Sequence, residues 1–136
     1  MRTISLIILH CSAVKPNQTS SAEQMNQWHK AQGWNAIGYH YVIRRDGTIE
    51  QGRPEAEVGA HCVNHNKHSI GICYEGGLDA NGNPADTRTP EQKAAIVSLL
   101  KSLKEKYPRA IIVGHNTFDP YKACPGFDAV KEYMDI

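Results

Sequence analysis

Three residues with metal-binding side chains stand at positions that a folded chain would hold rigidly. His10 and His115 each end an apolar run, and Cys124 lies in the loop 119–126. Zinc prefers imidazole and thiolate ligands, and catalytic zinc sites commonly use three protein ligands and keep a fourth position open. A buried strand fixes its last side chain, as a metal ligand requires. The sequence therefore predicts a catalytic site for one Zn²⁺ ion per chain.

Each of the three residues has a simpler interpretation when it is taken alone. A histidine at a strand end can be a core residue, and a lone cysteine can be a buried free thiol. The combination of three favours the metal site. Lys122 precedes Cys124 by two residues, where its cation would meet negative charge that develops on a substrate. The alternative for Lys122 is an ordinary surface cation.

The pattern of apolar and capping residues predicts the elements that carry these side chains. We expect strands at residues 3–10, 39–43, 49–51, 69–74 and 110–114, with a hairpin turn at Asp46-Gly47. We expect helices at about 21–32, 90–107 and 127–133. Ser20 or Ser21 can cap the first helix, and Ser20 with Glu23 fits a capping box. A strand that directly follows a helix implies parallel pairing, so the fold class is α/β, with a mixed sheet flanked by helices.

Length and charge narrow the class of protein. The chain has 136 residues and a net charge of +1, which fits a single domain over 1–136. No basic stripe marks a nucleic-acid partner, and no segment is long enough to span a membrane. Residues 1–11 resemble a signal peptide, but the apolar run is short and contains Ser5, so we interpret it as a strand. We therefore expect a monomer that is made in the cytoplasm without a signal peptide. Cys11 and Cys62 lack paired spacing and should be free thiols.

Seven segments, in order along the chain, resemble one known family. They include Trp28-His29-Lys30 and Lys122-Ala123-Cys124-Pro125, and together they cover residues 8–13, 27–34, 38–41, 45–53, 58–61, 68–73 and 122–128. The chain resembles the zinc-dependent N-acetylmuramoyl-L-alanine amidases of the type 2 class, in the peptidoglycan recognition protein superfamily. It is most similar to the small phage lysozymes that are amidases.

This resemblance implies the fold of that superfamily and a defined reaction. The amide between the lactyl group of N-acetylmuramic acid and L-alanine of the stem peptide would be cleaved in the bacterial cell wall. The resemblance assigns the zinc ligands to His10, His115 and Cys124, and catalytic roles to Tyr39 and Lys122. The physical argument agrees, because zinc lowers the pKa of a bound water and a nearby cation stabilises an oxyanion.

One position departs from many members of the class. Where they have a glutamate general base, this chain has Cys73, a residue that the phage-type members share. Alternation along a strand puts Gly71, Cys73 and Glu75 on one face, so we expect Cys73 at the site, next to substrate. Tyr39 and Lys122 are then the favoured proton-handling groups, with Glu75 as a weaker alternative.

Other residues are candidates for contacts with peptidoglycan or a muropeptide. His61 matches a histidine near the cleft of relatives, and it either contacts substrate or only packs. Trp34 lies in a loop that can border the groove, although a core or wall position is the simpler interpretation. His40 should point away from Tyr39 and be structural.

Two rival functions remain. A non-catalytic peptidoglycan-binding module would have lost a zinc ligand, and all three are present here. A recycling amidase for soluble muropeptides is disfavoured by Cys73 and by the phage-like motifs.

Overall fold

A five-stranded mixed sheet forms the centre of the molecule. The computed structural model describes residues 2–136. The strands follow the order β3-β2-β4-β1-β5 across the sheet. Their bounds are β1 Leu6–Cys11, β2 Tyr41–Ile43, β3 Ile49–Gln51, β4 Ser69–Tyr74 and β5 Ile111–Gly114.

Four of the strands, β2, β4, β1 and β5, are parallel, so their carboxyl ends meet at one edge. β1 pairs in parallel with both β4 and β5, and β2 pairs in parallel with β4. Only β3 runs antiparallel, as the return of a hairpin from β2. A mixed sheet of this kind was predicted, and it is confirmed.

Helices α1 Ala22–Ala31 and α2 Pro90–Lys106 are the two long helices. Each begins with a capping box, in which the cap side chain accepts from the third helical N–H and the third side chain accepts from the cap N–H. Two single-turn helices, α3 His115–Phe118 and α4 Ala129–Glu132, follow β5, and a 3₁₀ turn Asn66–His68 precedes β4.

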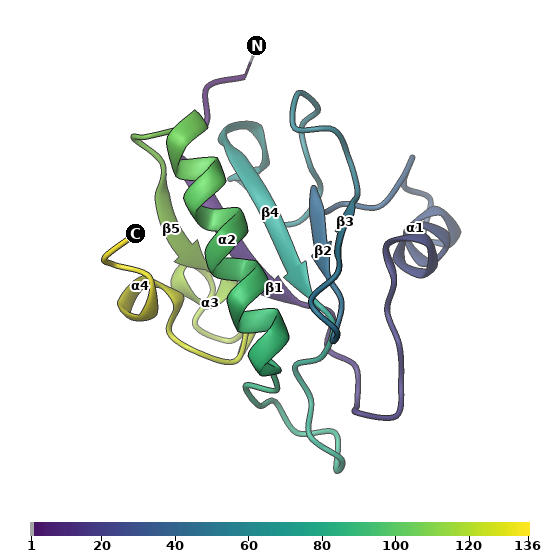
Figure 1. The fold of residues 1–136 in the computed structure, drawn as a ribbon. Helices are drawn as coiled ribbons and strands as arrows, with labels where there is room; N and C mark the ends of the chain where they lie inside the picture. The colour runs from purple at the N-terminus through teal and green to yellow at the C-terminus, as the bar shows by residue number, and fades with distance from the viewer. Residues whose placement is uncertain (1) are drawn as a thin grey trace.

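The two faces of the sheet are covered differently. α2 lies across one face (Figure 1) and buries Ile96, Leu100 and Leu103 against alternate residues of β1 and β4. The residues between those alternates point to the other face, where α1 and the loop after β3 lie. There Met25 and Ile37 pack against Val42 and Cys73. This second face carries His10.

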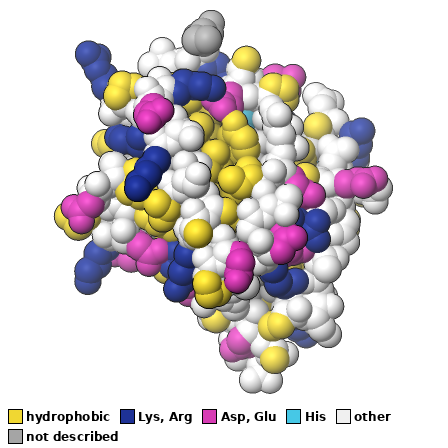
Figure 2. Space-filling model, in the orientation of Figure 1, with side chains coloured by type: hydrophobic (Ala, Val, Ile, Leu, Met, Phe, Trp, Pro, Cys, Tyr) yellow, Lys and Arg dark blue, Asp and Glu magenta, His cyan; other side chains and the backbone are white. Residues whose placement is uncertain are grey.

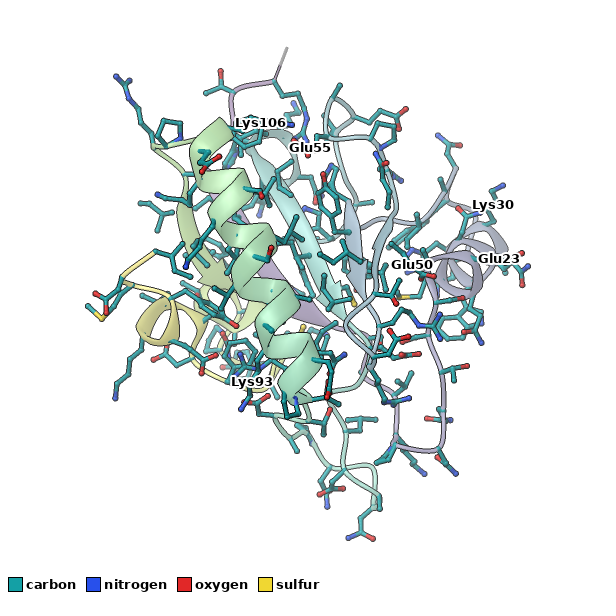
Figure 3. All side chains as sticks on the ribbon, viewed as in Figure 1. Glu23, Lys30, Glu50, Glu55, Lys93 and Lys106 are labelled. Carbon is teal, nitrogen blue, oxygen red and sulfur yellow. The ribbon has the colours of Figure 1, made fainter. Side chains whose placement is uncertain are left out.

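Side-chain bonds tie the peripheral segments to the sheet. Glu55, in the loop after β3, accepts hydrogen bonds from the hydroxyls of Tyr41 and Tyr107. Lys106 at the end of α2 points toward Glu55 (Figure 3) at 3.1 Å. Glu50 of β3 accepts a hydrogen bond from the first N–H of α1 at 2.8 Å.

On the face that Figure 2 displays, Lys and Arg side chains are interspersed with Asp and Glu. Among residues 2–136, no helix combines the length and the apolar character that crossing a membrane needs.

Several predicted boundaries need correction. The first strand is Leu6–Cys11 rather than 3–10, so His10 lies inside it. Of the two predicted caps for α1, Ser21 is the one used, and the capping box pairs it with Gln24 rather than Ser20 with Glu23. Ser20 is buried, and its N–H donates to Glu75. The last helix is shorter than the predicted 127–133.

Candidate metal centre and substrate groove

The parallel register brings the two candidate histidine ligands together. Leu9 of β1 is the partner of Gly114 of β5, so the next residue of each chain segment, His10 and His115, lies at the same sheet edge. Their ring centroids are 4.7 Å apart. His10 is buried, whereas His115 is half-buried in the first turn of α3.

Cys124 reaches the same point from the loop after α3. Its Sγ lies 3.9 Å from Nδ1 of His10 and accepts a hydrogen bond from the Cys11 N–H at 3.1 Å. The loop is held on both sides. Tyr74 donates its hydroxyl to the Pro125 carbonyl, and the Asn116 N–H donates to the Cys124 carbonyl at 2.8 Å.

The donor set fits zinc. One nitrogen of His10, one of His115 and the sulfur of Cys124 all lie within 4.8 Å of one another. In a tetrahedral zinc site, with Zn–N about 2.0 Å and Zn–S about 2.3 Å, neighbouring ligand atoms are about 3.5 Å apart. The spacing found here needs only small side-chain rotations to reach that value. Two imidazoles and one thiolate also leave a fourth position open.

Burial sets the protonation of these groups. It lowers the pKa of His10 well below its usual value, with His61 and His115 adding to the effect, and it also lowers the pKa of His115. Both imidazoles are therefore neutral at neutral pH, as metal ligands must be. The hydrogen-bonded Cys11 thiol and burial raise the pKa of Cys124. Without a cation this sulfur keeps its proton.

Tyr39 lies beside His10. Its ring centroid is 5.1 Å from that of His10. Burial raises the pKa of Tyr39 well above its usual value, and the neighbouring thiols of Cys73 and Cys124 add to this. The phenol is therefore protonated at neutral pH, so it can donate a hydrogen bond or orient a water but is not a ready base.

Cys73 has no exposed surface. It packs among Met25, Ile37 and Val42, behind Tyr39. The prediction of a direct substrate contact therefore needs correction, because a side chain without accessible surface cannot touch substrate. Its thiol supports Tyr39 instead.

Glu75 is directed away from the site. Its carboxylate accepts from the N–H groups of Ser20 and Arg45 and from the Arg44 guanidinium at 3.1 Å. Burial alone would raise the pKa of Glu75, but these bonds lower it overall. The interpretation of Glu75 as an alternative base is therefore wrong, since its carboxylate is engaged by these partners just beyond the C-terminal end of β4.

A groove of about 670 Å³ opens in front of His115 and Tyr39. That volume lies within the usual range for a small-ligand site. Lys122 lines the groove with an exposed side chain, and Asp119 of the same loop lines it too. The groove also contacts the small pocket at Cys124, to which Lys122 contributes.

The walls of the groove are partly apolar. Trp34 forms one wall, with its ring 4.4 Å from that of His29 and 39% of its surface exposed. Phe118 of α3 also lines the groove, stacked on His65 at 4.0 Å between ring centroids. The structure thus places Trp34 in the groove, as predicted, whereas Phe118 was missed.

His61 lies at the floor of the groove and is 8% exposed. Both of its ring nitrogens have protein partners. Nδ1 lies 2.9 Å from Nε2 of His10, and Nε2 lies 3.1 Å from the hydroxyl of Ser69. His40 is buried nearby, and its Nδ1 accepts from the Gly71 N–H, so its predicted structural role agrees with its contacts.

The groove residues that the sequence did not reveal lie in loops and in α3. Phe118, Asp119 and Asn66 reach the groove only through the packing of α3 and of the segment 60–68. The sequence offered one indication that Asp119 lines the groove, namely that it lies only a few residues before Lys122.

Comparison with known proteins agrees with this geometry. Residues 1–127 match the family model described as N-acetylmuramoyl-L-alanine amidase. The chain belongs to this family. This amidase is 48% identical over 124 residues to the endolysin of Klebsiella phage KP32, an alignment that covers 91% of this chain and 82% of the relative.

Solved structures support the same assignment of the fold. The N-acetylmuramoyl-L-alanine amidase LysC from Clostridium intestinale URNW superposes with a TM-score of 0.81 at 30% identity, covering 96% of this chain and 82% of that one. Wild-type Drosophila PGRP-LB superposes with a TM-score of 0.80 at 26% identity, over 99% of this chain and 82% of that one. The predicted family and fold are both confirmed, and the chain is a peptidoglycan amidase close to the phage lysozymes.

Proposed function

We propose that this amidase depends on one zinc ion held by His10, His115 and Cys124. The observation that carries the proposal is the convergence of two neutral imidazoles and one sulfur within 4.8 Å at the groove. When bound, zinc supplies a Lewis acid and lowers the pKa of a coordinated water to about 7. The substrate amide would be the one between N-acetylmuramic acid and L-alanine.

We assign two further roles to side chains of the groove. Lys122 meets the negative charge that builds on the carbonyl oxygen as the amide is attacked. Tyr39, protonated because it is buried, donates a hydrogen bond that orients water or the same oxygen.

The groove also suggests how a muropeptide is held. We propose that Trp34 packs against the substrate as an apolar wall, since its ring is partly exposed and fixed by His29. His61 can touch substrate only through its ring edge, because both nitrogens have protein partners. Substrate selectivity within peptidoglycan would then rest on the walls of the groove.

We propose that residues 1–136 act as one catalytic domain, a monomer that works on the bacterial cell wall after synthesis in the cytoplasm. A binding-only module is the second candidate. The complete ligand set and the presence of Tyr39 and Lys122 in one groove favour catalysis over binding alone.

A set of variants tests the proposed roles. Replacing any one of His10, His115 or Cys124 by Ala should remove most bound zinc and nearly all turnover. Lys122→Ala and Tyr39→Phe should keep stoichiometric zinc and muropeptide affinity but lose roughly 100- to 1000-fold in turnover, as expected for one lost electrostatic contact in the transition state. Metal analysis, binding and turnover are measured on the same preparations. Full zinc and normal turnover in Cys124→Ala would contradict the ligand assignment.

A further inference from the structure

His10 uses its two ring nitrogens in different ways. Nδ1 faces the sulfur of Cys124 at 3.9 Å, toward the proposed metal. Nε2 lies 2.9 Å from Nδ1 of His61. A metal-ligating histidine commonly has its second nitrogen bound to an acceptor that fixes its tautomer and ring orientation. Here that acceptor is another imidazole.

The position of the His61 ring is itself fixed. A Cβ on Gly71 would lie 2.6 Å from ring carbons of His61, and a Cβ on Gly59 would lie 2.7 Å from the ring. The two glycines therefore form a slot in which the ring lies against the backbone. The Asn66 side chain accepts from the His61 N–H at 2.9 Å and holds the main chain at the slot.

When His10 binds a cation through Nδ1, the hydrogen bonds from His10 to His61 and from His61 to Ser69 have only one possible direction. The Nδ1 lone pair is then used, so the His10 proton must sit on Nε2 and is donated to Nδ1 of His61. His61 in turn carries its proton on Nε2, which donates to the hydroxyl of Ser69 at 3.1 Å. Each ring nitrogen of His10 and His61 has one role in this series of hydrogen bonds, and none is left without a partner.

We propose that His61 is a positioning residue that holds His10 in its metal-binding tautomer and orientation, and that Ser69 accepts the last hydrogen bond of the series. This inference rests on the proposed zinc site, and it gives His61 a role other than substrate recognition. His61 does not itself contact the metal, since its Nδ1 is occupied by His10.

Zinc affinity in two matched variants provides the test. His61→Phe keeps an aromatic ring in the slot but removes the acceptor, and His61→Asn keeps an oxygen near the place of Nδ1. His40→Phe is the control, because His40 is a buried histidine whose hydrogen bonds go to Gly71, Glu57 and Arg2 rather than to His10. Dissociation constants for zinc come from competition with a chelator, and the unfolding midpoint of each metal-free protein is measured beside them.

We expect His61→Phe to bind zinc about 10- to 100-fold more weakly, the usual effect of losing a partner of a metal ligand. His61→Asn should recover most of that loss. His40→Phe should keep the wild-type zinc affinity even if its unfolding midpoint falls. The inference is overturned if His61→Phe binds zinc as the wild type does, or if His40→Phe loses as much affinity.

A spectroscopic measurement on the unmodified chain is independent of whether the variants fold. Long-range ¹H–¹⁵N correlation of the zinc-loaded protein should show His10 protonated at Nε2 and His61 also protonated at Nε2. A proton on Nδ1 of His61 would contradict the inference. Wild-type protein that binds no zinc would defeat the proposed zinc site, whereas zinc-binding wild type with the other tautomers would defeat only the role of His61.

Discussion

Arg88 joins the loop before α2 to the C-terminal segment, and its loss should destabilise the protein strongly. The Arg88 side chain is 1% exposed. Its guanidinium bonds both oxygens of Asp86 at 2.8 and 2.7 Å, the carboxylate of Glu132 at 3.0 Å, and the hydroxyl of Tyr133 at 2.6 Å. It also lies 3.4 Å from the centre of the Phe127 ring.

The size of the loss in unfolding free energy after Arg88→Met depends on how well water can solvate the carboxylates that lose the guanidinium. Breaking a buried ion pair costs about 3–5 kcal/mol when the remaining charge stays buried. Here the side chains of Asp86 and Glu132 are 31% and 42% exposed, so water can partly replace the guanidinium. The methionine also keeps much of the apolar stem. We therefore expect a loss near the lower end, about 3 kcal/mol of unfolding free energy.

Urea unfolding of the metal-free protein measures this loss, with Lys106→Met as the control. Lys106 makes an exposed pair with Glu55, which should contribute at most about 1 kcal/mol. The pH dependence adds a second signature. Arg88 lowers the pKa of Glu132, so its stabilisation is present above the usual glutamate pKa and is lost as pH falls through the lowered value. The difference between wild type and Arg88→Met should therefore shrink in acid. An Arg88→Met protein no less stable than the control would refute this account of the C-terminal segment.

Three further predictions concern pH and substrate. Burial lowers the pKa of His61 to about 3, so below about pH 6.5 His61 is protonated in the unfolded chain but stays neutral in the folded protein. The metal-free protein should therefore lose about 2 kcal/mol of unfolding free energy from this group between pH 7 and pH 5. An unfolding free energy that does not change with pH would contradict the neutral state of His61. Because the thiol of Cys124 must lose a proton to bind a cation, zinc affinity should rise about tenfold per pH unit near neutrality, and an affinity independent of pH in chelator competition would argue against this ligand. Trp34→Ala should raise KM for a muropeptide several-fold with little change in kcat or zinc content, and an unchanged KM would remove Trp34 from the substrate groove.

The sequence was sufficient for the sheet and for the two histidines that converge on the candidate metal site. Apolar runs before His10 and His115 indicated adjacent strands, and parallel pairing places the ends of such strands at one edge. The capping box of α2 was also recognisable, because Thr89, Pro90 and Gln92 have a local pattern with a local cause. The position of Cys124 required the family motif, since nothing local determines where a loop returns.

The sequence failed where a residue's partner depends on tertiary packing. Alternation along β4 correctly placed Gly71 and Cys73 on the face of the site, but it could not show that Tyr39 would cover Cys73. The same alternation favoured Glu75 as a base, although Arg44 and the main chain of the loop 18–20 engage its carboxylate beyond the end of the strand. The bond between His10 and His61 joins positions 51 residues apart, and no pattern in the sequence marks it.

The central claim is that this amidase needs zinc, which His10, His115 and Cys124 would hold, to cleave the amide between the glycan and its stem peptide. Purified peptidoglycan should be digested with the chelated protein and with the same protein after zinc is restored, and the products analysed by mass spectrometry. The account predicts stem peptides that begin with a free L-alanine, released only by the zinc-restored protein, with the glycan strands left long. Equal release by the chelated protein, or shortened glycan with new reducing ends, would contradict it.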